Sequence, residues 1–281
     1  LIPPTQESQL PADYHQRYAI GYKDTAFNPV KTWTEYLNRL TGVSIGFLIF
    51  LTAWRSRIFL RDDKAVFYLS LTAFFLVGFQ GWLGSAVVAS KLTPLIITLH
   101  MLLALVIVAL LIYVFARSQK SRWPVIRRED LPPKFMPVLM VAMGMTIVQI
   151  MMGTQIREAV DVLANEHSYI ERRFWREDFP LVFYVHRSFS SLILFTNVWM
   201  AWKFYRQFGP NALIVKVAIC ILGLIVTAIL AGVAMDRLGM PAVAQPVHLL
   251  MANLIFGTQF LLFIILGYAL TPQPITPTQS G

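Results

Sequence analysis

The fold is decided by the apolar run LIITLHMLLALVIVALLIYVFA at residues 95–116, which holds one histidine, His100, and no Asp, Glu, Lys or Arg. A helix needs about 20 apolar residues to cross the hydrocarbon core of a bilayer. Because lipid offers no partner to backbone N–H and C=O groups, such a run must be helical. The run therefore predicts a membrane-spanning helix that carries one ionisable side chain.

Six further blocks of the chain are similarly apolar. The chain is 56% hydrophobic and 14% charged, and its mean hydropathy is +0.58, which is too apolar for a soluble domain of this size. We therefore predict an all-α fold, a polytopic membrane helix bundle. The predicted spans are residues 36–54, 66–88, 95–116, 135–155, 181–202, 212–235 and 244–270.

The basic residues predict the orientation. The loops after the first, third and fifth predicted helices are rich in Lys and Arg, and the whole formal net charge of +9 lies on that side. By the positive-inside rule this side is cytoplasmic. Since these charges lie in short loops beside helix ends, we do not expect nucleic-acid binding. The single cysteine, Cys220, lies in an apolar run and is interpreted as a packing residue.

Two halves of the chain repeat at an offset of 148 residues. We predict an N-terminal repeat at 1–116, a cytoplasmic linker at 117–134 and a C-terminal repeat at 135–281. The block at 135–155 has its counterpart ahead of Leu1, so we expect eight helices in the full protein, four per repeat, with the first one missing here. The matched pairs are Asn38-Arg39 with His186-Arg187, Ala53-Trp54 with Ala201-Trp202, Gly84 with Gly232, His100 with His248, and Ala104 with Ala252.

The repeat places polar residues at matched depth near the outer helix ends. An ionisable group inside a membrane is costly and indicates function, although a histidine can also simply bond a neighbouring helix. His186 and His248 come from two helices, as the two axial ligands of a haem iron do, whereas zinc needs three or four ligands. The first repeat has His100, but Asn38 replaces its partner and Glu35 lies one turn earlier. That set suits a haem that reacts or is a substrate, although Glu35 could also be a helix-start carboxylate paired with a nearby arginine.

Several motifs together resemble the haem A synthase family. The resemblance covers essentially the whole chain, and each motif alone would be weak. They are Glu35-Tyr36-Leu37-Asn38-Arg39, Gln80-Gly81-Trp82-Leu83-Gly84-Ser85-Ala86-Val87-Val88, His100, Gly153-Thr154-Gln155-Ile156-Arg157-Glu158, His186-Arg187, and Gln245-Pro246-Val247-His248.

The resemblance implies an oxidoreductase that converts the C8 methyl group of haem O to the formyl group of haem A, for cytochrome oxidase biogenesis. It implies haem b as cofactor between His186 and His248, and a substrate-haem site at His100 and Asn38 with Glu35 as the catalytic residue. Haem O synthase is the expected donor of substrate, and the electron acceptor stays open. The expected location is a bacterial-type inner membrane, with the haem-ligand ends on the periplasmic side.

Two departures from the family pattern concern the first repeat and the loops. Asn38 stands where the family has histidine, so we expect an open or water-bound axial position on the substrate haem. The outer loops also lack the cysteine pair of many members.

Three arginines, Arg39, Arg157 and Arg187, could pair with haem propionates or extend to lipid headgroups. Two other functions remain as alternatives, a di-haem b-type electron-transfer protein and a non-catalytic haem-binding assembly factor. A protein that only transfers electrons would favour two complete histidine pairs.

Overall fold

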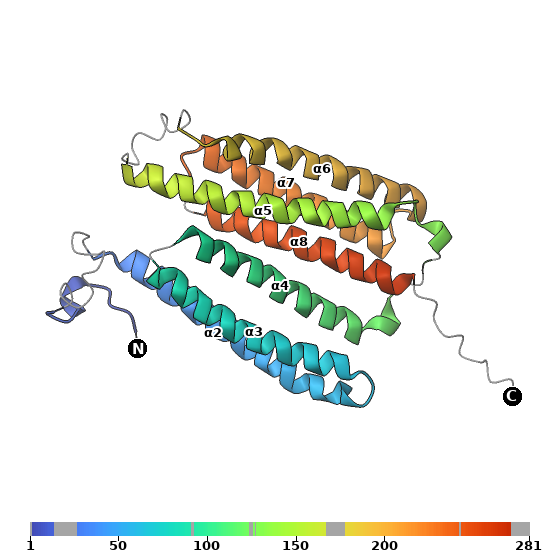
Figure 1. Ribbon diagram of the computed structural model, residues 1–281, viewed down its shortest axis with the longest axis horizontal. Coiled ribbons are helices and arrows are strands. Elements are labelled where there is room, and N and C mark those ends of the chain that lie inside the picture. Colours follow the sequence, from blue (N-terminus) through green and yellow to red (C-terminus); the bar gives the residue numbers. More distant parts are fainter. Residues whose placement is uncertain are drawn as a thin grey trace. The chain divides into compact units, whose positions relative to one another are not determined.

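The computed structural model describes residues 2–13, 27–90, 93–123, 126, 128–166, 178–241 and 243–270. Within these residues every regular element is helical, and seven long helices fall on the seven predicted blocks (Figure 1). The predicted all-α polytopic bundle is therefore confirmed. The long helices are α2 (Pro29–Arg55), α3 (Lys64–Ala89), α4 (Pro94–Ser118), α5 (Phe135–Glu166), α6 (Leu181–Phe208), α7 (Leu213–Arg237) and α8 (Ala244–Ala269), and the short 3-10 turns are η1 (Glu7–Gln9), η2 (Ser56–Leu60), η3 (Lys120–Arg122) and η4 (Arg128–Asp130).

Local signals explain where several helices begin and end. α2 and α4 start at Pro29 and Pro94, where the missing N–H of proline costs no helical hydrogen bond. The side chain of Asn28 also caps α2 by accepting a hydrogen bond of 3.2 Å from the backbone N–H of Lys31. α6 ends at Gly209, whose φ of +73° is readily adopted only without a Cβ.

The chain divides into two compact units, Leu1–Gly81 and Trp82–Gly281. The first unit contains α2 and most of α3, which meet where the rings of Phe50 and Phe74 lie 5.6 Å apart. The predicted halves at 1–116 and 135–281 rest on the sequence repeat rather than on compactness. They remain a prediction.

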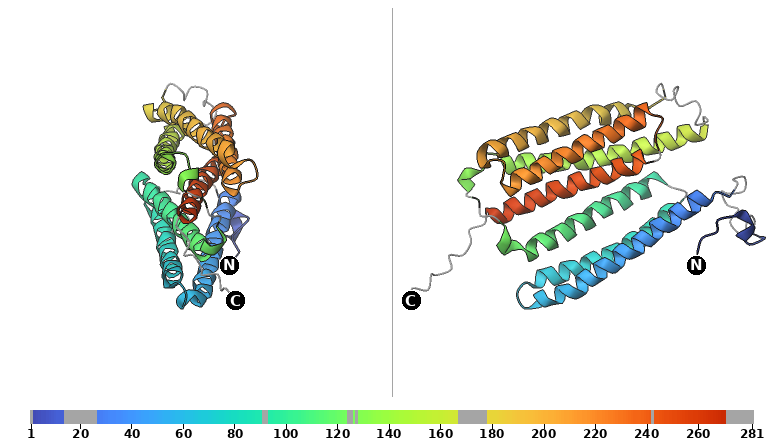
Figure 2. Two further views of the ribbon diagram at one scale, coloured as in Figure 1. Left: turned by 90° about the vertical axis from the view of Figure 1, so that its right-hand side faces the viewer. Right: turned by 180° about the vertical axis from the view of Figure 1, so that it is seen from behind.

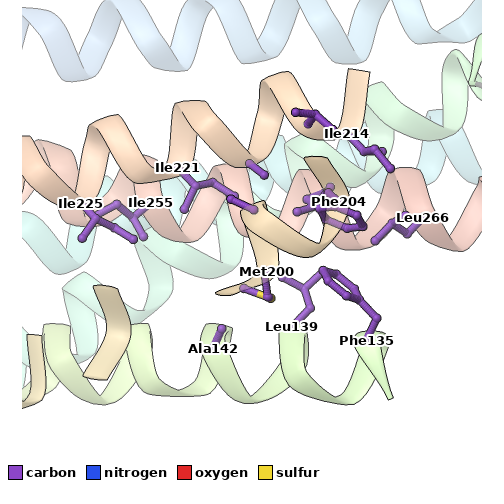
Figure 3. Close-up of a cluster of buried hydrophobic side chains, with 14 of the residues drawn as sticks. Phe135, Leu139, Ala142, Met200, Phe204, Ile214, Ile221, Ile225, Ile255 and Leu266 are labelled. Atoms are coloured by element: carbon purple, nitrogen blue, oxygen red, sulfur yellow. The ribbon is translucent and has the colours of Figure 1, made fainter. Parts of the chain in front are cut away.

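The core of the second unit lies among α5, α6, α7 and α8. Side chains from all four helices interdigitate there, and the rings of Phe135 and Phe204 lie 4.1 Å apart (Figure 3). Outward-facing side chains such as Val106, Phe195 and Leu230 are apolar and exposed, as expected for a surface against lipid. Since lipid tails are as apolar as these side chains, the bundle is held by close packing and interhelical hydrogen bonds.

α4 lies against α8, which separates it from α7 (Figures 1 and 2). α4 and α8 are counterparts in the 148-residue repeat. Gly257 allows their close approach, because a Cβ there would lie 3.3 Å from Ile112 and 3.5 Å from Val108. The repeat therefore appears in this unit as two equivalent helices packed on one another.

α6 differs from the other long helices in composition. By length and composition, six helices in the described part of the chain could cross a membrane, and α6 is not among them. Its apolar residues are interrupted by His186-Arg187-Ser188, Ser190-Ser191 and Thr196-Asn197. The expectation that block 181–202 is apolar enough to span alone is therefore not met. The bundle accommodates some of this polarity, since Asn197 is buried between helices.

Candidate functional site

His186 and His248 lie together in the second unit. Each is about one turn into its helix, in α6 and α8 respectively, and the two imidazole rings are 6.2 Å apart between centroids at an interplanar angle of 51°. Both rings are half-buried. The two residues, which lie 62 positions apart in the sequence, are thus brought next to one another with their rings tilted.

The spacing of the two rings fits one metal ion between them. A metal–nitrogen bond is about 2 Å long, and a ring nitrogen lies about 1 Å from its ring centre, so two axial imidazoles on one metal have centroids about 6 Å apart. No group of three or more His, Cys, Asp and Glu side chains that could hold a metal occurs in the described ranges. Two imidazole donors suit a metal whose other ligands come from a macrocycle, as in haem.

The imidazole of His248 is held by its surroundings. Its Nδ1 lies 2.8 Å from the backbone carbonyl oxygen of Ala228 on α7. A proton on Nδ1 donated to this carbonyl leaves Nε2 with its lone pair, the form that binds a metal. Gly232, one turn further along α7, provides room, because a Cβ there would lie 3.4 Å from Cε1 of the ring.

The surroundings of His186 are different. The side-chain Nε2 of Gln149 on α5 donates a hydrogen bond of 3.0 Å to the backbone oxygen of His186, which fixes the helix rather than the ring. Nδ1 of His186 is buried and has no hydrogen-bond partner among the residues that the structure describes. Gly153 lies beside this ring, with a Cβ position 3.7 Å from Cε1. The orientation of His186 is therefore less constrained than that of His248.

Both histidines line a cavity of about 280 Å³, which we term the histidine cavity. This volume is close to the lower limit of about 300 Å³ for small-molecule pockets. Its wall is largely apolar, with Ile193, Ile225 and Ile255 among its members. The polar residues that line it, besides the two histidines, are Thr146, Gln149, Arg187, Ser190, Asp236 and Arg237.

Sequence reasoning identified Arg187 in this wall but missed Asp236 and Arg237. Their counterparts in the first repeat are Val88 and Ala89, so the repeat gave no signal for them. A charged pair at the end of an otherwise apolar helix was the available clue. Arg157, which the sequence also suggested, is half-buried on α5 and is not one of the residues lining the cavity.

His100 has surroundings like those of His248. A Cβ on Gly84 would lie 3.2 Å from Cε1 of His100, just as Gly232 lies beside His248. Gly84 and Gly232 are 148 residues apart, and so are His100 and His248. The packing of a histidine ring on a glycine of the preceding helix is therefore common to both repeats.

Glu35, Asn38 and Arg39 lie on α2 in the first unit, whereas His100 lies in the second. Within α2, the guanidinium of Arg39 forms an ion pair with the carboxylate of Glu35, four residues apart, and all three side chains are exposed. This pairing is one of the alternatives that the sequence left open for Glu35. The substrate-haem site built from Glu35, Asn38 and His100 stays a prediction.

The fold and the histidine cavity together define an integral membrane helix bundle in which two imidazoles lie 6.2 Å apart beside a largely apolar cavity. Residues 1–260 match the model of the COX15-CtaA family of cytochrome oxidase assembly proteins, and the chain belongs to that family. It is also 28% identical over 150 residues to the heme A synthase of Shewanella oneidensis, a match that covers 53% of this chain and 42% of the relative. The matched part is thus less than half of that protein. No solved structure matches the chain.

Proposed function

We propose that the protein is a haem A synthase, which oxidises the C8 methyl group of haem O to a formyl group. The proposal is supported by family membership, by similarity to a protein named heme A synthase, and by the residues of the histidine cavity. The observation that carries it is the 6.2 Å separation of His186 and His248 in an apolar cavity with cationic side chains in its wall.

The histidine cavity is the proposed site of a haem b cofactor. His186 and His248 would hold its iron, Ala228 would keep Nε2 of His248 available, and Arg187 would pair with a propionate. When bound, this group would supply one-electron redox chemistry.

Glu35 is the proposed catalytic residue of the substrate site. Conversion of a methyl group to a formyl group takes up the oxygen atom of one water and releases four electrons and four protons (–CH3 + H2O → –CHO + 4 H+ + 4 e−), so the reaction needs water, an electron acceptor and a base. A carboxylate near the methyl group could take a proton or stabilise developing positive charge. Within α2 this carboxylate forms an ion pair with Arg39. His100 and Asn38 are proposed to bind the substrate haem, with Asn38 leaving one axial position open.

The proposed partners and location follow from the same function. Haem O is the substrate, a haem O synthase is its donor, and an acceptor in the membrane receives the electrons. The histidine-bearing ends of α4, α6 and α8 would lie on the periplasmic side of a bacterial-type inner membrane, opposite the basic loops.

The function is tested by expressing the full-length protein with a haem O synthase in a host that lacks haem A, followed by extraction and mass analysis of membrane haems. Haem A is expected with the natural sequence and should fall by about a hundredfold or more, the contribution of a general base, on Glu35→Gln. Glu129→Gln is the matched control, because Glu129 is an exposed carboxylate in the loop after α4.

The alternative functions predict a different product. Haem O and haem b recovered unchanged, from a protein with a normal low-spin haem spectrum, would overturn the proposal. That result would favour electron transfer or haem carriage instead.

A further inference from the structure

Two guanidinium groups line the histidine cavity, those of Arg187 on α6 and Arg237 on α7. Arg187 has no ion-pair partner in the part of the chain that the structure describes. Arg237 is the last residue of α7, and its Nε lies 3.3 Å from the carboxylate Oδ2 of Asp236. The cavity therefore has positive charge in its wall beside the histidine pair.

Asp236 is unfavourably placed for stability alone. Its side chain is only 14% exposed, whereas that of Arg237 is 54% exposed. It also lies in the last turn of a helix, where the helix dipole disfavours a negative charge. A mostly buried carboxylate at such a position is costly unless a neighbouring group pairs with it.

What Asp236 does is orient Arg237. A guanidinium has five N–H donors in a planar fork. Because Asp236 engages the Nε edge, the terminal Nη donors of Arg237 stay available to a second acceptor. Two such donors in one plane match the two oxygens of a carboxylate, which Arg binds in bidentate fashion.

We infer that Arg237, oriented by Asp236, binds a carboxylate group of the molecule in the histidine cavity and acts there together with Arg187. This inference rests on the proposed function, since the carboxylates would be the propionates of the cofactor haem. Two guanidiniums also match two propionates in number, with Asp236 acting as a positioning residue. The competing reading is that Arg237 extends to lipid headgroups and does not contact the ligand.

The test compares two ligands that differ only in the carboxylates. Full-length protein freed of haem is titrated with haem b and with its dimethyl ester, and binding is followed by the low-spin absorption spectrum. Arg237→Gln should weaken the binding of haem b by on the order of tenfold, the effect of one charge-assisted hydrogen-bonded pair. The same variant should bind the dimethyl ester as the natural protein does. The preference of the protein for haem b over the ester should therefore fall.

Three further variants sharpen the result. Arg237→Lys should keep part of the preference for haem b over its dimethyl ester, because lysine keeps the positive charge but lacks the planar N–H donors of the guanidinium. Asp236→Asn should lower it less than Arg237→Gln, because the guanidinium remains without its orienting charge. Arg206→Gln is the matched control, since Arg206 is exposed at the other end of α6 and does not line the cavity.

The outcomes separate the inference from the function on which it rests. An equal loss of both ligands in Arg237→Gln, or no loss of either, would overturn the role of Arg237. Failure of the natural protein to give a low-spin spectrum with either ligand would instead contradict the haem site itself. As a second readout, the reduction potential of the haem in protein isolated with it bound should fall in Arg237→Gln and not in Arg206→Gln, because a positive charge near the propionates disfavours the oxidised iron.

Discussion

At the scale of single residues, a glycine on the preceding helix leaves room for the imidazole ring of His100 and of His248. Gly84 and Gly232 are the positions where a Cβ would come closest to an imidazole, at 3.2 and 3.4 Å from Cε1 of His100 and His248. At 3.2 Å the ring of His100 would have to move, whereas at 3.4 Å the ring of His248 would be in van der Waals contact with the added carbon and would lose its free space on that side. Because His248 is also tied to Ala228 by a hydrogen bond of 2.8 Å, its ring cannot shift without losing that bond.

Gly232→Ala is therefore expected to disturb the haem ligand while leaving the helix intact. The amount of low-spin haem in the purified protein should fall, and the resonance positions in its electron paramagnetic resonance spectrum should shift. Gly223→Ala on the same helix is the control, since nothing lies within 4 Å of a Cβ there. That change should leave the spectrum unchanged and alter stability by about 0.5–1 kcal/mol in the stabilising direction. Identical spectra for the two variants would contradict the role of Gly232.

The residues of the site differ in how far sequence predicted them. The repeat marked His100, His186 and His248 because each is an ionisable group at a matched position in an apolar block. Gln149 and Asp236 were not predicted as site residues, because nothing in their immediate sequence indicates that they line a cavity. Which way a side chain faces in these helices could not be read from periodicity, since apolar residues occupy both the lipid-facing and the buried faces.

At the scale of helices, a buried polar chain joins three members of the bundle in the second unit. The hydroxyl of Thr146 on α5 donates to Oε1 of Gln259 on α8 at 2.9 Å, and Nε2 of Gln259 donates to Oδ1 of Asn197 on α6 at 3.2 Å. All three side chains are buried, and Gln259 is completely inaccessible. These hydrogen bonds fix α5, α6 and α8 relative to one another, and these helices carry Gln149, His186 and His248.

Gln259→Leu should accordingly destabilise the bundle. The change leaves a buried amide oxygen on Asn197 without its donor, which costs about 1–3 kcal/mol, although interhelical hydrogen bonds in membranes average only about 0.6 kcal/mol. The measurement is the free energy of unfolding in detergent. Thr227→Val, at an exposed position of α7, is the control and should change it by less than about 0.5 kcal/mol. A loss no larger in Gln259→Leu than in the control would show that the polar chain does not support the bundle.

The helices themselves were predicted well because their signal is length and composition, which the bilayer imposes directly. All seven long helices overlap the predicted blocks. The prediction that every block is apolar enough to span a membrane failed for α6. Some of its polar residues are accommodated within the protein, as Asn197 is by α8. Composition alone cannot separate a helix that lipid surrounds from one that its neighbours shield.

At the scale of the whole molecule, the charge asymmetry predicts which ends of the helices face the cytoplasm. At one such end, Arg57 lies 4.0 Å from the ring centre of Trp54, and Lys203 lies 5.1 Å from that of Trp202. Trp54 and Trp202 are counterparts in the repeat. Tryptophans and basic side chains of this kind are typical of the membrane interface, so the same end of each repeat has the same character.

The orientation can be tested by labelling introduced cysteines in intact cells, after Cys220 has been replaced by alanine. Leu238→Cys, in the exposed turn between α7 and α8, should react with a membrane-impermeant maleimide. Ser121→Cys, in the exposed turn after α4, should react only after the membrane is opened. The reverse pattern would place the histidine-bearing ends in the cytoplasm and contradict the proposed orientation.

The central claim is that one haem is held between α6 and α8 by His186 and His248. Its most direct test is the electron paramagnetic resonance spectrum of the purified oxidised protein, with each histidine replaced by alanine in turn. The account predicts a low-spin signal of two axial imidazoles that is abolished by His186→Ala and by His248→Ala and kept in His100→Ala. The same low-spin signal persisting in the His186→Ala/His248→Ala double variant would contradict it.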